Sequence, residues 1–384
     1  MKYPAIYVLL FITLLAGTAH GQKAATVFGK QETIPDAYTY TADSLAFYIS
    51  LHHSSEADRL QALYQWMTAH MKYNVYTTFE SRNEVYSEEK DVRNTLRTRS
   101  GVCRNFSLAF KTVAEKMDIP AFMVEGYVKN EGVLMTDPHA WCCAKVNGQW
   151  FLYDVTFGMG GINNNNQFTS NPNMDYCRKT PIQMLQNHMP FDPMWQLIEA
   201  PYPYHIYDQS ATLPAATASA GFHCNDTIKT YIRQSKAQQQ MDICRRIRAN
   251  GKSNPLVDYY LQLTQSNIKV YKSQEVYDIY KKAIKSFNQA TDLYNDFIHY
   301  RKAKFQPEWE EEKVNNLLDA SSRANNAAYH HLLDLAHAPE EYETAVRNLM
   351  DDVKMVTARI EKQREFVNAY YKASPSRRKR FFRD

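Results

Sequence analysis

The sequence predicts an α+β domain in the N-terminal half, with a helix-borne cysteine packed on an antiparallel sheet, followed by an all-α domain. Two observations predict this division. Two short runs rich in apolar residues flank Asn147-Gly148, a strong signal for the two-residue turn of a hairpin. From Lys252 to the end there is no glycine, and prolines bound long stretches with helical spacing. The domains then span residues 22–200 and 225–374, with a linker over 201–224 and a basic tail over 375–384.

The first residues have the pattern of an export signal. Lys2 precedes an apolar run over residues 6–15, and the small-residue sequence Ala19-His20-Gly21 follows. The run is well short of the about 20 residues that cross a bilayer, so we expect cleavage near Gly21 and no stable membrane insertion. Residues 1–21 would be a signal peptide, and the mature chain would be periplasmic or extracellular. A net charge of +4 over 384 residues is too mild to indicate nucleic acid as a partner.

Local signals order the elements of the N-terminal domain. Ser55-Glu56-Ala57-Asp58 fits a capping box, and the helix after it carries apolar residues on one face until about Asn74. The polar segment 77–91 predicts a loop. A second helix is expected over 103–117, and strands are expected over 121–128, 140–146 and 149–155.

The C-terminal domain is expected to be an antiparallel helical bundle. Its helices are predicted over 226–249, over 255–305 with an interruption, over 308–337, and from 339 to before Ser374. The tail from Arg377 to Arg383 is basic with two aromatic residues. We expect a solvated tail there rather than a surface for anionic lipid or polysaccharide.

Cys103 is the candidate nucleophile because of its predicted position in the first turn of a helix. Unpaired backbone N–H groups and the positive end of the helix dipole favour a thiolate there. The same amides can stabilise the oxyanion that forms when a carbonyl is attacked. A cysteine in the middle of a helix would have neither advantage.

The predicted hairpin supplies the two partners of that cysteine. A two-residue turn places His139 opposite Thr156, with Asp154 its diagonal neighbour, close enough for an imidazole to meet a carboxylate. We expect the Cys103 helix to pack on this face, which also carries Trp141 and Trp150. A thiol, an imidazole and a carboxylate form an activated nucleophile. The spacing is not that of papain, where the histidine follows the cysteine by about 130–150 residues.

The other cysteines predict no metal site and no disulfide framework. Cys142 and Cys143 are adjacent, and no cluster among the six cysteines has zinc-ligand spacing. Cys224 and Cys244 could form a disulfide or remain free buried thiols. We expect no metal and no cofactor, and a structural role for His188.

Five motifs resemble the transglutaminase-like superfamily of cysteine proteins, in the branch with the kyphoscoliosis peptidase and bacterial cytokinesis-associated proteins. They are Arg99-Ser-Gly-Val-Cys103, Gly126-Tyr-Val-Lys129, His139-Ala-Trp141, Gly148-Gln-Trp150 and Asp154-Val-Thr-Phe-Gly158. The resemblance covers about residues 41–197 and leaves the helical half outside. It implies that Cys103 is the nucleophile, His139 the acid and base, and Asp154 the residue that orients His139. Four further residues are candidates for the substrate cleft: Trp141 and Trp150 as walls, and Asn105 and Tyr73 beside the oxyanion or in packing.

The expected function is acyl transfer through a thioester on Cys103, with a protein or a cell-wall peptide as substrate. Water would give hydrolysis, and an amine would give a cross-link; no calcium-binding loop accompanies the site. The alternative is a catalytically silent binding module that acts through its helical domain. An arylamine acetyltransferase would use the same triad, but its acetyl-CoA is cytoplasmic, which disagrees with the export signal.

Overall fold

The structure is a computed structural model and describes residues 33–75, 87–163, 165–214, 223–251, 254–336 and 338–382. The predicted signal peptide lies outside these ranges. The chain divides into two compact units, Met1–Gln265 and Ser266–Asp384. The division falls inside helix α10 (Pro255–Lys302), downstream of the linker that the sequence predicts. Within the described residues, no helix combines the length and the apolar character needed to cross a membrane.

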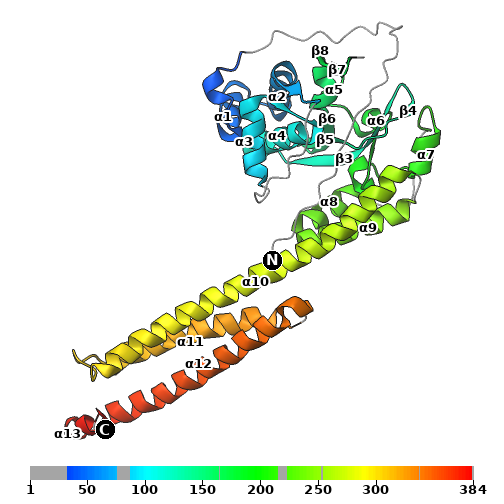
Figure 1. Cartoon of the computed structure of the whole chain (residues 1–384). Helices are drawn as coiled ribbons and strands as arrows, with labels where there is room; N and C mark the ends of the chain where they lie inside the picture. Colours follow the sequence, from blue (N-terminus) through cyan, green and yellow to red (C-terminus); the bar gives the residue numbers. More distant parts are fainter. Residues whose placement is uncertain are drawn as a thin grey trace. The chain divides into compact units, whose positions relative to one another are not determined.

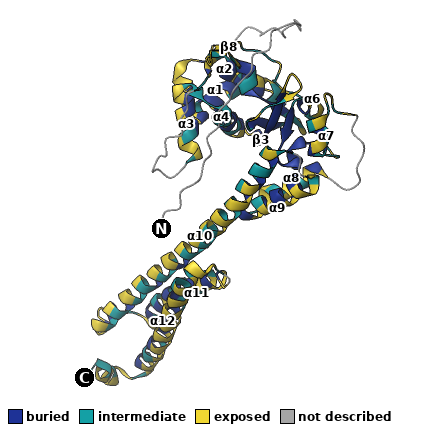
Figure 2. Cartoon of the chain, turned by 45° about the vertical axis from the view of Figure 1, so that its right-hand side comes forward, coloured by how far each residue is buried: buried dark blue, intermediate teal, exposed yellow. Residues whose placement is uncertain are grey.

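A five-stranded antiparallel sheet lies at the centre of the first unit, in the order β4-β3-β5-β6 with β9 paired to β3. Strands β5 and β6 pair with Lys145 opposite Trp150 and Val146 opposite Gln149, which confirms the two-residue turn. Both turn residues, Asn147 and Gly148, have positive φ, as that turn requires. Figure 2 shows β3 largely in the colour of buried residues. The strands are β3 (Ala121–Asn130), β4 (Val133–Leu134), β5 (His139–Val146), β6 (Gln149–Tyr153) and β9 (His188–Pro190).

One face of the sheet is covered by four helices (Figure 1): α1 (Ala42–His52), α2 (Glu56–His70), α3 (Glu88–Thr98) and α4 (Cys103–Lys116). Ser55 caps α2 by accepting from Asp58 N. Helix α3 starts inside the segment predicted as a loop, where Ser87 Oγ accepts from Lys90 N.

Helix α4 packs on the face of the sheet opposite to the predicted one. Phe110 contacts Tyr153 at 5.1 Å between ring centroids, and the thiol of Cys142 donates to Ser107 O. The prediction was wrong because both faces of the hairpin are apolar, so alternation alone could not choose between them. The large core cluster on this side joins Cys142, Ala144 and Val146 to the helices.

The other face of the sheet is covered by elements later in the chain, of which α8 and α9 lie beyond the resemblance. Trp141, Cys143 and Leu152 pack with Trp195 of η2 (Pro193–Gln196) and with Ile228 of α8 (Cys224–Arg233). Helix α9 (Lys236–Asn250) adds a buried ion pair, because Arg246 donates to both oxygens of Asp192 at 2.7 Å. The sequence predicts one helix over 226–249; the structure has two, because Ser235 caps α9 through Gln238 N.

Short elements complete the first unit. Strands β1 (Lys72–Tyr73) and β2 (Ser100–Gly101) pair in parallel just before Cys103. The remaining elements are α5 (Val155–Met159), the hairpin of β7 (Gly160–Ile162) and β8 (Phe168–Ser170), α6 (Pro181–Met184) and α7 (Tyr204–Gln209).

The second unit is helical. It contains the rest of α10, α11 (Glu311–Leu333), α12 (Glu340–Lys372), α13 (Pro375–Arg378) and η3 (Lys379–Phe382). Helix α10 has no interruption, contrary to the prediction. The described part of the tail is not simply solvated: Phe381 and Phe382 lie 5.6 and 5.9 Å from Phe366 between ring centroids. Burial of these two rings holds the basic residues beside helix α12.

Candidate active site

Cys103 is the first residue of α4 and is half-buried. The turn before it is fixed by Asn105, whose Oδ1 accepts from Val102 N at 2.9 Å and whose Nδ2 donates to Asp91 Oδ1 at 2.9 Å. These bonds give Asn105 a structural role that ties the start of α4 to α3. All six cysteines are free thiols, including Cys224 and Cys244.

His139 and Asp154 meet at the end of the β5–β6 hairpin. His139 is the first residue of β5, and its Nε2 lies 2.7 Å from Asp154 Oδ2. Both side chains of this hydrogen bond are buried. The thiol of Cys103 is among the groups that raise the pKa of this imidazole, so it lies near the ring. Because Nε2 faces the carboxylate, Nδ1 is the nitrogen left for the thiol and the reacting atoms. The structure therefore brings the three predicted residues together.

Asp154 is held on every side. Its Oδ1 accepts from Phe157 N at 3.1 Å and so caps α5. Its backbone N–H donates to Tyr176 O, and its carbonyl accepts from Tyr64 OH. Tyr64 fits because residue 158 is glycine: a Cβ there would lie 1.9 Å from the Tyr64 hydroxyl. The motif Asp154-Val-Thr-Phe-Gly158 thus fixes the position of the carboxylate.

A second histidine lies on the same carboxylate, and sequence reasoning missed its place. His188 Nε2 is 3.0 Å from Asp154 Oδ2, and the side chain is fully buried. His188 belongs to β9, which pairs with β3 next to the start of β5. A strand of three residues carries no detectable periodicity, so no sequence signal marked this contact.

The charges of the site favour a protonated His139 at neutral pH. Burial alone would lower the pKa of His139, but the charge of Asp154, the hydrogen bond with Asp154 and the nearby Cys103 thiol raise it to about 10. Burial works to raise the pKa of Asp154, but His139 and His188 hold it well below its usual range. Burial lowers the pKa of His188. An imidazolium beside a thiol favours the thiolate.

The four candidate cleft residues lie in different surroundings. Trp141 is buried, and its ring packs against both imidazoles, with centroids 5.0 Å from His188 and 6.1 Å from His139. Trp150 donates from its indole to Asn225 of α8 and lies away from the three catalytic candidates. Tyr73 is near Cys103: burial, and then the charge of that thiol, raise the pKa of its hydroxyl. Of these three residues, Tyr73 is the one that lies near Cys103.

His139, Asp154 and His188 are also residue types that bind metals, with ligand atoms within 4.8 Å of one another. Their geometry is that of hydrogen bonding. Each Nε2 lies at N–H···O distance from the same oxygen, so the nitrogens that would bind a metal already donate protons.

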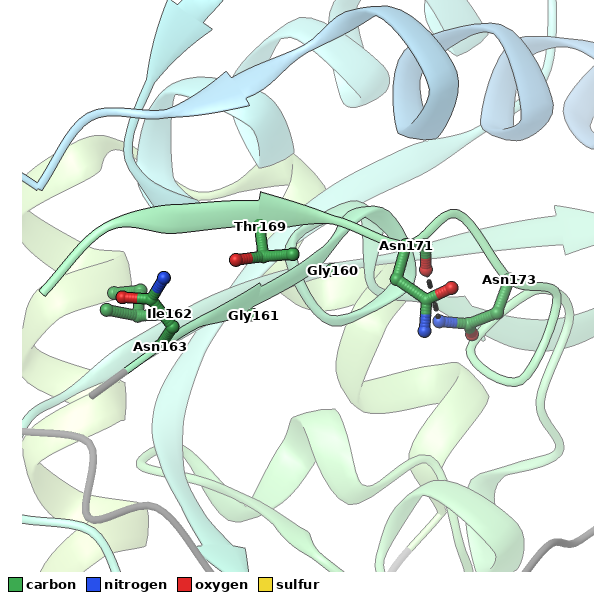
Figure 3. A pocket seen from close by; sticks show the side chains of 7 residues that line it. All are labelled: Gly160, Gly161, Ile162, Asn163, Thr169, Asn171 and Asn173. Carbon is green, nitrogen blue, oxygen red and sulfur yellow. Dashed lines mark hydrogen bonds between the residues drawn. The ribbon is translucent and has the colours of Figure 1, made fainter. Parts of the chain in front are cut away.

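A shallow pocket of about 390 Å³ lies along β7 and β8 (Figure 3). Thr169 and the amides of Asn163, Asn171 and Asn173 line it, together with Gly160 to Ile162. Asn173 Nδ2 donates to Phe157 O, and the Phe157 ring stacks on His139 at 4.8 Å. Phe157 therefore connects the lining of this pocket to His139.

The antiparallel sheet with helices packed on it is a transglutaminase-like core. The profile of the Transglutaminase-like superfamily matches residues 43–155, and the chain contains a domain of that superfamily. The curated relatives include the kyphoscoliosis peptidase of Mus musculus, 24% identical over 163 residues that make up 41% of this chain and 24% of that protein. The Homo sapiens kyphoscoliosis peptidase is 24% identical over 154 residues, which are 38% of this chain and 23% of that protein. The chain thus matches about a quarter of the length of these relatives.

Two solved structures are similar to about a third of the chain. One is a proposed cysteine protease from Cytophaga hutchinsonii, which is 21% identical to this chain with a TM-score of 0.23. The match covers 31% of this chain and 39% of the protease chain. A TGase structure shares 23% identity over 32% of this chain and 33% of its own, also with a TM-score of 0.23.

Proposed function

We propose that the chain is an exported, cysteine-dependent acyl-transfer enzyme that acts on amide bonds of proteins or cell-wall peptides. The observation that supports this most directly is the buried 2.7 Å hydrogen bond between His139 and Asp154, on an imidazole whose pKa the nearby Cys103 thiol helps to raise. In this proposal Cys103 is the nucleophile, His139 the acid and base, and Asp154 the group that orients His139. The N-terminal export pattern supports a site of action outside the cytoplasm.

The proposed reaction begins when the thiolate of Cys103 attacks the carbonyl carbon of the amide. The electron pair of the C=O bond moves to oxygen, where N–H groups in the first turn of α4 can stabilise it. When the oxyanion collapses, the C–N bond breaks and His139 gives its Nδ1 proton to the leaving nitrogen. The products of this half are a thioester on Cys103 and a free amine or ammonia.

The second half of the reaction decides the outcome. Water or an amine attacks the thioester carbonyl, His139 takes the proton of the attacking group, and Cys103 leaves as a thiolate. Water completes a hydrolysis. A lysine amine completes a cross-link.

The first test is alkylation of the full-length protein by iodoacetamide across pH, read at each cysteine by peptide mass spectrometry. Burial raises the pKa of the Cys177 and Cys224 thiols to about 12, so Cys103 should be labelled selectively near neutral pH. His139→Ala should slow that labelling by about tenfold or more. Peptides with glutamine or cell-wall amides are then screened with Cys103→Ala and, as a matched control, Cys177→Ala.

We expect turnover to disappear in Cys103→Ala and to persist in Cys177→Ala. Labelling of Cys103 no faster than of Cys177 would contradict an activated nucleophile. That result would favour the silent binding module, and the search would turn to partners of the helical unit.

A further inference from the structure

The carboxylate of Asp154 accepts from two imidazoles on one oxygen. His139 Nε2 lies 2.7 Å from Oδ2, and His188 Nε2 lies 3.0 Å from the same atom. The backbone N–H of Phe157 occupies Oδ1 at 3.1 Å. The thiol of Cys103 affects the pKa of His139 and is not among the groups that affect the pKa of His188.

We propose that His188 is a positioning residue, which holds Asp154 in the orientation that His139 needs through the whole acyl-transfer cycle. This rests on the proposed function, because it assigns His188 a part in that same reaction. His188 touches neither the nucleophile nor the reacting atoms; it acts through Asp154.

The need for a second donor follows from burial. Asp154 is completely buried, and an ionised carboxylate away from water is costly unless its lone pairs are bonded. His139 changes its protonation and its Nδ1 partner during turnover, so its bond to Oδ2 is subject to change. The N–H of His188 takes no part in proton transfer and keeps Oδ2 bonded at every step.

His188 is itself fixed from behind. Its Nδ1 lies 2.7 Å from Oδ1 of Asn187, and Nδ2 of Asn187 donates to the hydroxyl of Tyr176 at 2.8 Å. These contacts hold the imidazole in the orientation that directs Nε2 at Asp154.

The two histidines lie on different strands, β5 and β9, and both strands pair with β3. Gly126 of β3 pairs with His139 of β5 and with Pro190 of β9, and Val128 pairs with His188. The two imidazoles therefore reach Oδ2 from strands anchored to adjacent stretches of β3. Packing alone would be satisfied by any side chain of similar size between Trp141 and Tyr176, which lie 5.0 and 5.6 Å from the His188 ring.

The experiment compares full-length His188→Gln, which keeps a neutral N–H donor, with His188→Met, which has similar volume and no donor. The readouts are kcat and KM separately, and the pH dependence of Cys103 alkylation. We expect His188→Met to lose about 10–100-fold in kcat with little change in KM. Loss of a hydrogen-bonding partner that orients a residue of an active site has effects of this size in metalloenzymes. Its alkylation should also shift to higher pH, and His188→Gln should restore most of both.

Other results would overturn the positioning role. Wild-type kcat and alkylation in His188→Met would do so, and so would equal losses in His188→Met and His188→Gln, which would mean a packing role. If His188→Met does not fold, Asn187→Leu tests the same series of contacts from Asn187 through His188 to Asp154. An unchanged pH profile of Cys103 alkylation in that variant would reject the positioning role. Failure of the proposed function looks different, because the wild type itself would then show no selective reaction at Cys103.

Discussion

At the scale of single residues, the site depends on hydrogen bonds that leave Asp154 no freedom. Its carboxylate, its N–H and its carbonyl are all bonded, and the bonds come from α5, β9, α2 and the Tyr176 segment. The sequence could predict Cys103, His139 and Asp154 because each belongs to a local motif. It could not predict the contact of His188, because the partners are far apart in sequence and β9 is too short to be read.

The raised pKa of His139 has a consequence for stability. The ordinary value in an unfolded chain is about 6.5, and the folded value is about 10, so the native state binds more protons between these limits. The stabilisation from His139 is therefore full below about pH 6.5 and is lost as the pH rises toward about 10. We expect the free energy of unfolding in urea to fall over this window.

His139→Gln is the matched control for that measurement, since it keeps a hydrogen-bond donor and removes the titration. Its unfolding free energy should depend less on pH in the same window. Equal slopes for the variant and the wild type would show that His139 is not the group responsible.

At the scale of elements, the register of the sheet positions the site. The close approach of β3 to β9 in that register requires glycine at residue 126. A Cβ on Gly126 would lie 2.2 Å from Met189 O and 2.5 Å from the Trp141 ring. The hairpin register was predictable, because Asn147-Gly148 admits one tight turn. The face that α4 covers was not, because it depends on α8 and η2, which cover the other face and come much later in the chain.

Gly126→Ala should therefore open the contact between β3 and β9 and cost about 1–3 kcal/mol or more in the free energy of unfolding. Gly161→Ala is the control: no atom lies within 4 Å of its Cβ position. We expect that variant to stay within about 0.5 kcal/mol of the wild type in urea unfolding. Equal stability of the two variants would argue against the close approach at Gly126.

At the scale of the whole molecule, the part that matches the superfamily is smaller than the compact unit that contains it. The match ends at residue 155, whereas the first unit extends to Gln265. Tyr260 of α10 stacks on Phe191 with ring centroids 4.4 Å apart, so the start of that helix belongs to this unit. Composition alone predicted the domain boundary at the linker over residues 201–224. A boundary inside a continuous helix such as α10 has no proline, glycine or change of composition to indicate it.

A chain cut after Leu197 should accordingly fail to fold, whereas a chain cut after Gln265 should fold. The shorter piece loses Ile228, which covers Trp141, and leaves Asp192 without Arg246. Near-UV circular dichroism and urea unfolding of both pieces check this. A cooperative transition in the shorter piece would show that α8 and α9 are dispensable.

The ion pair between Asp192 and Arg246 bears on how sequences of this kind can diverge. Removing one member of such a buried pair costs about 3–5 kcal/mol, whereas exchanging both for apolar residues is often neutral. Single replacements should therefore be rare among relatives that keep α9 against η2, and the two positions should change together. A joint substitution at 192 and 246 in an aligned sequence would then mark a chain whose α9 helix still packs in this place.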